Sequence, residues 1–242
     1  MTLKSYGLSD IGKKRTNNED SFLMREQLFC VADGMGGYSF GEKASKMATA
    51  LLASLYEISE TTLTQGNVAE TLLDWVKEIN GQIYRENQKE SSHMGTTIAL
   101  SLFLNDKLFL ANVGDSRIYR ISPKIGIEQI TDDHSLVAEQ VRLGLITEEE
   151  ARNHPRRNII TRALGIFPDV NVDTFTCTPQ AEDFFLLCSD GLCSLVNNDK
   201  IAEIILMPEI DLKAKARDLI AAANEAGGND NITIILIEVQ NA

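Results

Sequence analysis

Acidic residues stand beside the ends of several β-like apolar runs in this chain of 242 residues. Those that follow a run are Asp33, Asp115 and Asp190, and those that precede one are Glu19, Asp20 and Asp230. Neighbouring antiparallel strands would bring these positions to one edge of a sheet, where like charges repel and suppress ionisation. Divalent cations remove that penalty, and a ligand set made only of oxygen atoms favours Mg²⁺ or Mn²⁺ over Zn²⁺. The sequence therefore predicts a site for hard metal ions.

Two hard cations held by carboxylates are suited to the hydrolysis of phosphate esters. Such a pair polarises a water molecule, orients the phosphoryl group and neutralises its charge, and this reaction is among the slowest without a catalyst. A guanidinium would complete the site by binding two phosphate oxygens in a bidentate manner. Arg15 is the candidate, because it lies just ahead of Glu19. Any single aspartate here is better explained as a turn residue at a strand end, so the prediction depends on the whole set.

The elements that must position these residues can be read from the spacing of apolar residues. Helical spacing occurs in four segments, namely 41–59, 67–83, 199–207 and 212–223. Strand-like runs lie between and after them, including 97–104, 107–113, 184–189 and 231–239. Two helices, several strands, two helices and a last strand predict an α+β fold in which sheets pack together with helices outside. No linker or internal repeat is visible, so we expect one domain over residues 1–242.

The segment around residues 132–160 does not fit that pattern. It contains a short helical run at 135–143 and a capping-box pattern at Thr147 and Glu150. The arginines in and next to it are Arg142, Arg152, Arg156, Arg157 and Arg162. On charge alone, a solvent-exposed surface loop is the simpler interpretation. Long insertions on a rigid scaffold nevertheless often carry binding elements, so this segment is also a candidate for contact with a phosphorylated partner.

Composition and charge exclude several classes of protein. The net charge of -12 argues against a general binder of nucleic acid or of anionic membranes. The apolar runs are far shorter than the roughly 20 residues that a membrane-spanning helix needs, and the first residues lack the apolar core of a signal peptide. The four cysteines lie within or beside apolar runs and are expected to be reduced thiols. We therefore expect a cytoplasmic protein.

Six short motifs follow one another in a recognisable order. They are RTNNED (15–20), VADGMGG (31–37), GTT (95–97), NVGDSR (112–117), SDGL (189–192) and GGNDNIT (227–233). Together they resemble the type 2C metal-dependent serine/threonine protein phosphatases, particularly the short bacterial members, over essentially the whole chain. The resemblance implies a four-layer α-β-β-α sandwich, with two antiparallel sheets flanked by helix pairs and a flap at about 132–160.

The resemblance also implies a role for each matching residue. The metal ligands would be Glu19, Asp33, the Gly34 carbonyl, Asp115, Asp190 and Asp230. Asp33 would bridge two Mn²⁺ or Mg²⁺ ions; Asp190 and Asp230 would complete the shell of one ion, and Glu19 that of the other. Asp115 and Asp190 would form a third metal site. Asp20 would hydrogen-bond metal-bound water, and Arg15 would bind the phosphate.

Met35 departs from the pattern of many eukaryotic relatives, which carry a histidine after the Asp-Gly as the proposed acid for the leaving alcohol. A thioether cannot donate a proton, so the leaving-group acid stays unassigned, with metal-bound water as the simplest candidate. The three histidines, His93, His134 and His154, are expected to be structural or exposed.

The implied activity is hydrolysis of phosphoserine and phosphothreonine in proteins by a metal-activated water, without a phosphoenzyme intermediate. A cognate serine/threonine kinase is an implied partner, and a monomer is expected. Cysteine-dependent phosphatases, serine hydrolases and Walker-type NTPases are disfavoured, because their motifs are missing from the sequence. The alternative is a catalytically silent metal-binding regulatory module on the same scaffold. Degenerate relatives usually lose acidic ligands, and here every expected carboxylate is present.

Overall fold

Two antiparallel sheets form the centre of the protein, as the sequence predicts. The computed structural model describes residues 1–36, 40–64, 66–90 and 92–240. The β11 sheet contains, in spatial order, β1 (Thr2–Asp10), β11 (Ile232–Gln240), β10 (Phe184–Cys188), β7 (Arg117–Ser122) and β8 (Gly126–Gln129). The β3 sheet contains β2 (Asp20–Met24), β3 (Leu28–Met35), β5 (Ile98–Leu104), β6 (Lys107–Val113) and β9 (Asp173–Cys177), and β4 (Gly95–Thr96) pairs with β3.

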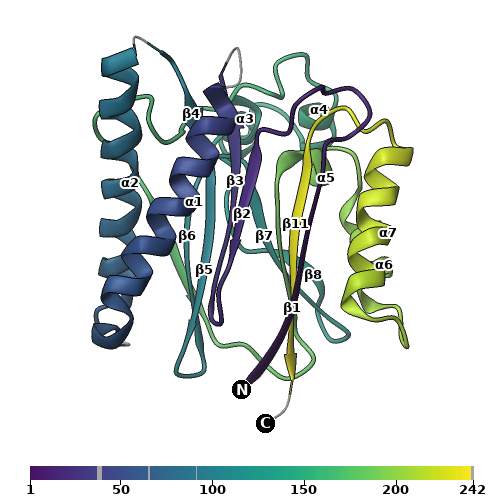
Figure 1. Ribbon diagram of the computed structural model, residues 1–242. Coiled ribbons are helices and arrows are strands. Elements are labelled where there is room, and N and C mark those ends of the chain that lie inside the picture. Colours follow the sequence, from purple (N-terminus) through teal and green to yellow (C-terminus); the bar gives the residue numbers. More distant parts are fainter. Residues whose placement is uncertain (37–39, 65, 91, 241–242) are drawn as a thin grey trace.

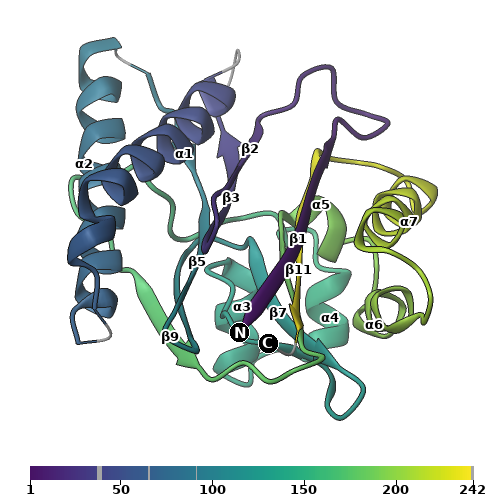
Figure 2. The same ribbon diagram turned by 60° about the horizontal axis from the view of Figure 1, so that its bottom comes forward.

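Helix pairs cover the outer faces of the two sheets (Figures 1 and 2). On the β3 sheet these are α1 (Phe40–Ser59) and α2 (Val68–Glu90), which are joined through the 3-10 turn η1 (Glu60–Thr62). On the β11 sheet they are α6 (Asn198–Leu206) and α7 (Leu212–Glu225). The four layers confirm the expected α-β-β-α sandwich. Among the described helices, none combines the length and the hydropathy needed to cross a membrane.

Three apolar layers hold the four structural layers together. One lies between the β3 sheet and its helices, a second between the β11 sheet and its helices, and a third between the two sheets. Alternation along β11 explains the arrangement: Ile234 and Leu236 face the helices, whereas Ile235 and Ile237 face the other sheet. A strand buried on both faces must be apolar at every position. This is why 184–189 and 231–239 appear as nearly continuous apolar runs.

Strand β1 is a long element that the sequence pattern did not predict. It pairs with β11 over nine residues, from Thr2↔Gln240 to Asp10↔Ile232. Its side chains are exposed or half-buried because it lies at the edge of the sheet. An edge strand needs no apolar run, so its pairing depends on main-chain hydrogen bonds rather than on a hydrophobic signal.

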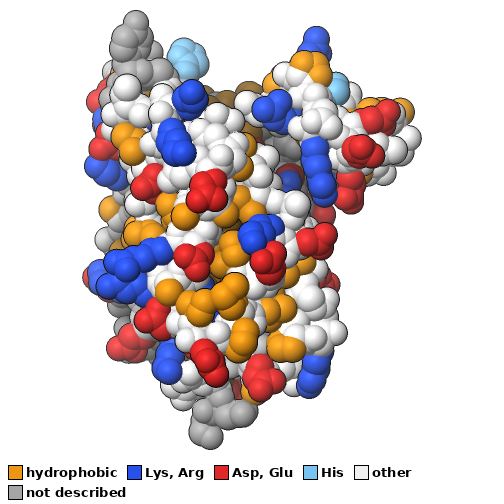
Figure 3. All heavy atoms as spheres, turned by 90° about the vertical axis from the view of Figure 1, so that its right-hand side faces the viewer, with side chains coloured by type: hydrophobic (Ala, Val, Ile, Leu, Met, Phe, Trp, Pro, Cys, Tyr) orange, Lys and Arg blue, Asp and Glu red, His pale blue; other side chains and the backbone are white. Residues whose placement is uncertain are grey.

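The flap leaves the body between β8 and β9. It contains α3 (Leu136–Arg142) and α4 (Glu148–Arg152), and the predicted capping box of Thr147 and Glu150 is formed. Residues 132–160 hold six acidic residues and four arginines, so the flap as a whole is not basic. Two of the arginines, Arg156 and Arg157, lie in the turn after α4, whereas Arg142 and Arg152 end α3 and α4. In Figure 3 the flap projects at the upper right, with side chains of both charges and exposed apolar groups on its surface.

Gly34 and Gly41 allow helix α1 to approach β3 at backbone distance. A Cβ atom at Gly41 would lie 2.7 Å from the carbonyl carbon and oxygen of Gly34. Since both sides of this contact are main chain, neither can move aside as a flexible side chain could. The contact fixes the start of α1 against the end of β3, where Asp33 lies.

Replacing Gly41 with alanine should therefore lower the free energy of unfolding by about 1–3 kcal/mol, the usual cost of overpacking. The matched control is Gly81→Ala in the interior of α2, where the new methyl would meet only the end of the Arg85 side chain. That change should raise stability by roughly 0.5–1 kcal/mol, because glycine weakens a helix. Urea denaturation measures both values, and equal effects of the two substitutions would contradict the close contact.

Candidate active site

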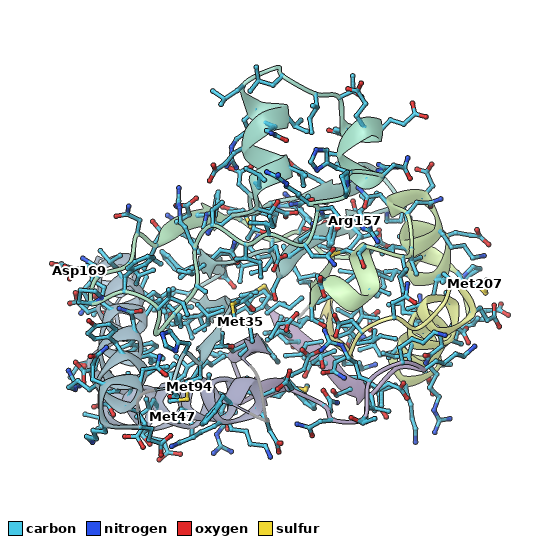
Figure 4. All side chains as sticks on the ribbon, turned by 90° about the horizontal axis from the view of Figure 1, so that it is seen from above. Met35, Met47, Met94, Arg157, Asp169 and Met207 are labelled. Atoms are coloured by element: carbon cyan, nitrogen blue, oxygen red, sulfur yellow. The ribbon has the colours of Figure 1, made fainter. Side chains whose placement is uncertain are left out.

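The predicted acidic residues meet at one end of the sandwich. Asp20 is the first residue of β2 and pairs in register with Asp33 near the end of β3. Asp115 lies in the turn between β6 and β7, Asp190 begins the short helix α5 (Asp190–Cys193), and Asp230 precedes β11. Figure 1 shows β2, β3, α5 and the start of β11 at the same end. In Figure 4, which looks down on this end, Met35 lies near the middle and Arg157 lies nearer the flap helices.

Polar side chains outside the predicted set hold these loops in place. The Asn231 side chain accepts from the Glu19 N–H at 2.8 Å and donates to the Asn17 and Ile11 carbonyls. Asn231 thereby joins the start of β11 to the loop before β2. The Asn18 side chain accepts from the Asp20 N–H at 3.1 Å. These asparagines were missed as functional residues, although both belong to the quoted motifs, because apolar periodicity carries no signal for them.

Two hydroxyl groups in the core also hold acidic residues in place. Ser189 Oγ donates to Asp20 Oδ2 at 2.8 Å and thus joins β10 to β2 across the two sheets. Thr97 Oγ1 accepts from the Asp33 N–H at 2.9 Å. Both hydroxyl residues are fully buried, so these positions are set by the core and do not depend on solvent.

Burial and mutual repulsion raise the pKa values of the central carboxyl groups. Burial is the main cause for Asp33, whose pKa lies well above its ordinary range, and the charges of four other aspartates add to it. Burial likewise raises the pKa of Asp20 to about 6, of Asp115 to about 7 and of Asp190 to about 8. Burial also raises the pKa of Glu19. The protein side chains alone therefore do not neutralise this site.

Arg15 is the cation nearest to the cluster. Its guanidinium donates to Asp230 Oδ2 at 2.7 Å and lies 4.0 Å from Glu19 Oε2. The hydrogen bond to Asp230 raises the pKa of the arginine further. The arginine side chain is 47% exposed, so it can rotate toward a ligand that enters from solvent.

The residues present fit hard cations that keep part of their water. One carboxylate oxygen each of Asp20, Asp115 and Asp190 is buried and lacks a hydrogen-bond partner among the described residues. Within the same residues, no group of three or more acidic, histidine or cysteine side chains converges enough to enclose an ion. Mg²⁺-like ions usually bind through one or two carboxylates and retain several waters. Unpartnered oxygens without a closed cage match that mode of binding.

Gly34, the predicted carbonyl ligand, lies between Asp33 and Met35 at the end of β3. Its N–H donates to the Glu19 carbonyl at 3.1 Å, so it lies beside the start of β2. Gly37, the last residue of the VADGMGG motif, lies outside the described residues.

Comparison with known proteins gives this geometry a context. The family model for protein phosphatase 2C matches residues 10–230. The serine/threonine phosphatase stp of Listeria monocytogenes serotype 4b is 40% identical over 237 residues, which cover 95% of this chain and 93% of that protein. The chain belongs to the protein phosphatase 2C family.

Solved structures of phosphatases have the same fold as this family member. The serine/threonine phosphatase Stp1 from Staphylococcus aureus superposes with a TM-score of 0.93 at 36% identity, covering 100% of this chain and 96% of that one. The catalytic domain of the phosphatase PstP, in complex with two manganese ions, superposes with a TM-score of 0.88 at 35% identity and covers 99% of both chains. The predicted family and fold are thus confirmed.

The raised pKa values give the protein phosphatase 2C site a testable pH dependence. Carboxyl groups with folded pKa values of about 6 to 8, against an ordinary 3.8, bind more protons in the folded state. Their contribution to stability therefore falls as the pH rises through that range. With a chelator present, the melting temperature should fall between about pH 6.5 and pH 8. The increase produced by Mn²⁺ should be larger at about pH 8, because protons then compete less for the oxygens.

Thermal unfolding followed by circular dichroism measures both effects. The window begins at about pH 6.5 because burial lowers the pKa of His134 below its ordinary 6.5, so that residue titrates below the window. A melting temperature that rises across the window in chelator, or an effect of Mn²⁺ that is equal at both ends, would contradict the repulsion described here.

Proposed function

We propose that this chain is a metal-dependent phosphatase that hydrolyses phosphoserine and phosphothreonine esters in proteins, without a phosphoenzyme intermediate. The observation that carries the proposal is the placement of Asp20, Asp115, Asp190 and Asp230 at the same end of the sandwich as the half-buried Asp33, with Arg15 bonded to Asp230. Family membership supports it, because the similar proteins are themselves called serine/threonine phosphatases. A silent regulatory module would not require every acidic position to be kept.

That placement supports the metal-binding residues that the family resemblance implies. Asp33 and the Gly34 carbonyl would contact two Mn²⁺ or Mg²⁺ ions, with Asp190 and Asp230 on one side and Glu19 on the other. A third ion would bind between Asp115 and Asp190, which repel each other in the absence of a cation. Bound cations supply polarisation of water and neutralisation of phosphoryl charge.

Arg15 and Asp20 act on the reactants in this proposal. The Arg15 guanidinium would exchange its bond to Asp230 for two bonds to phosphate oxygens, since cations would then balance the aspartate charge. Asp20 would accept a hydrogen bond from the attacking water. Its other oxygen is held by Ser189, so the carboxylate is already oriented before substrate binds.

The proton for the leaving alcohol is assigned to no histidine. Nδ1 of the buried His134 accepts from the Gly114 N–H, and its Nε2 faces Asp173 at 3.0 Å. Nδ1 of His154 accepts from the Arg156 N–H within the flap. Met35 stands where a histidine acid would be, so the proton is expected to come from water in the site.

The broader setting belongs to the proposal as well. Phosphoproteins are the expected partners, and a cognate serine/threonine kinase would supply them. We propose a cytoplasmic monomer in which residues 1–242 act as one phosphatase domain, with the flap at about 132–160 facing the substrate.

Asp190→Asn tests the site assignment in two opposite directions. Turnover of a phosphothreonine peptide with Mn²⁺ should fall by more than about 100-fold. Substitution of residues that only hydrogen-bond a metal ligand already lowers activity by up to about 100-fold. The free energy of unfolding of the chelator-treated protein should rise, because the amide removes a repelled charge whose pKa is about 8. A single pKa unit is on the order of 1 kcal/mol, and the gain should exceed that value near pH 7.

The matched control is Asp199→Asn, the same chemical change at an exposed position in the first turn of α6. It should alter neither turnover nor stability appreciably. Full activity of the Asp190 variant would contradict the site assignment. No turnover by the unaltered protein on several phosphopeptides at saturating Mn²⁺ would favour the silent module.

The arginines of the flap provide a second test, of substrate recognition. Arg156 and Arg157 are exposed, and neither forms an ion pair with another described residue. Changing both to alanine should lower kcat/KM for a phosphoprotein by about tenfold, equivalent to 1.4 kcal/mol, and leave a small aryl phosphate nearly unaffected. The control is Lys213→Ala with Arg217→Ala on the exposed face of α7. Equal losses on both substrates would exclude a role in protein recognition.

A further inference from the structure

His134 connects the base of the flap with the turn that carries Asp115. Its side chain is only 1% exposed. Its backbone N–H donates to the Gly114 carbonyl at 3.0 Å, and its Nδ1 accepts from the Gly114 N–H at 3.0 Å. Main chain and side chain of one residue thus bind both polar groups of the residue directly before Asp115.

The same histidine also holds the returning segment of the flap. Its carbonyl accepts from the Thr161 N–H at 2.8 Å, and its Nε2 faces Asp173 Oδ2 at 3.0 Å. Because Nδ1 is an acceptor, the neutral ring carries its proton on Nε2 and donates it to Asp173. Arg162 donates to the other oxygen of Asp173 at 2.9 Å. Both ends of the flap therefore meet at one buried residue.

Gly114 cannot move independently of the metal-binding end. Its φ of +109° suits glycine, and a Cβ atom there would overlap the Thr97 side chain. Thr97 in turn accepts from the N–H of Asp33. A displacement of the flap base would therefore shift Gly114 and, with it, Asp115. Thr97, which packs against Gly114, would resist that shift.

The neighbours of His134 strengthen this connection. Arg117 donates three hydrogen bonds to the Asp133 carboxylate, at 2.7 to 3.1 Å. Asn112 Nδ2 donates to the Asp132 carbonyl at 3.2 Å. Three consecutive residues at the flap base are thus bound to the segment on either side of Asp115, which is more than a surface loop needs for anchoring.

We propose that His134 is a positioning residue that couples the flap to Asp115, so that the place of the flap and the orientation of this carboxylate are set together. The inference rests on the proposed function in one respect, namely that Asp115 binds a cation. Coupling between two sites is reciprocal. Binding of a cation at Asp115 must then restrain the flap, just as engagement of the flap must favour the cation.

Amide hydrogen exchange followed by mass spectrometry tests this coupling in the full chain. Saturating Mn²⁺ should slow exchange in residues 136–160 by about fivefold or more, the lower end of usual coupling. In His134→Gln the amide can still reach Asp173 but offers Gly114 no acceptor at the Nδ1 position. The Mn²⁺-dependent slowing of the flap should then fall below half of its original size. A purely structural role would change exchange with and without Mn²⁺ alike and leave their ratio intact.

Two further variants complete the experiment. His134→Asn keeps an acceptor near Gly114 but loses the donor to Asp173, so it should also reduce the flap response, and it replaces the glutamine variant if that one fails to fold. His93→Gln changes an exposed histidine and should leave the response unaltered. Peptides from β2 and β3 report separately on cation binding. The coupling is overturned if Mn²⁺ slows exchange in the β2 and β3 peptides but not in residues 136–160. It is also overturned if Mn²⁺ slows exchange in the flap of the His134 variants as much as in the unaltered protein. Absence of protection in both regions overturns the proposed metal site and the coupling with it.

Discussion

Repulsion among buried carboxylates is the constraint on which the rest of this structure depends. Four aspartates, Asp20, Asp115, Asp190 and Asp230, lie close enough to Asp33 for their charges to raise the pKa of its carboxyl group. An arrangement of this kind opposes folding, and it persists because three apolar layers and a set of buried hydrogen bonds stabilise the surrounding frame. The stored unfavourable energy is released when cations bind, so affinity for metal and instability without metal have the same origin.

Both sheets contribute acidic residues to this site. Asp20 and Asp33 come from the β3 sheet, whereas Asp190 and Asp230 flank strands of the β11 sheet. The site therefore exists only where the sheets meet, and Ser189 and Asn231 are the side chains that lock the two halves in register. The apolar layer between the sheets determines how far apart the opposing carboxylates lie. The apolar contact between the sheets thus sets both the packing of the core and the spacing of the acidic residues at its edge.

The sequence predicted the fold and the acidic site to different depths. The helices and the buried strands carry strong apolar periodicity, and most were placed within a few residues of their observed bounds, although α2 continues to Glu90, seven residues beyond the predicted end at 83. Strand β1 was missed because its pairing is made by the main chain at a sheet edge. The identity of the acidic residues followed from their places at strand ends, but the pairing of Arg15 with Asp230 did not, since residues 215 positions apart share no local pattern. The network around His134 was missed for the same reason: an isolated histidine in a polar loop gives no signal until its neighbours are known.

The position of the flap in the topology has a consequence for how such proteins diversify. It connects β8, at the edge of one sheet, to β9, at the edge of the other. A change of length between two edge strands shifts no central strand, and the entropy of closing a longer loop grows only slowly with its length. Flaps could therefore be lengthened, shortened or exchanged between relatives while the acidic centre stays intact. Target choice and bond cleavage would then evolve as separable traits, provided that the residues joining the flap base to the β6–β7 turn are carried along.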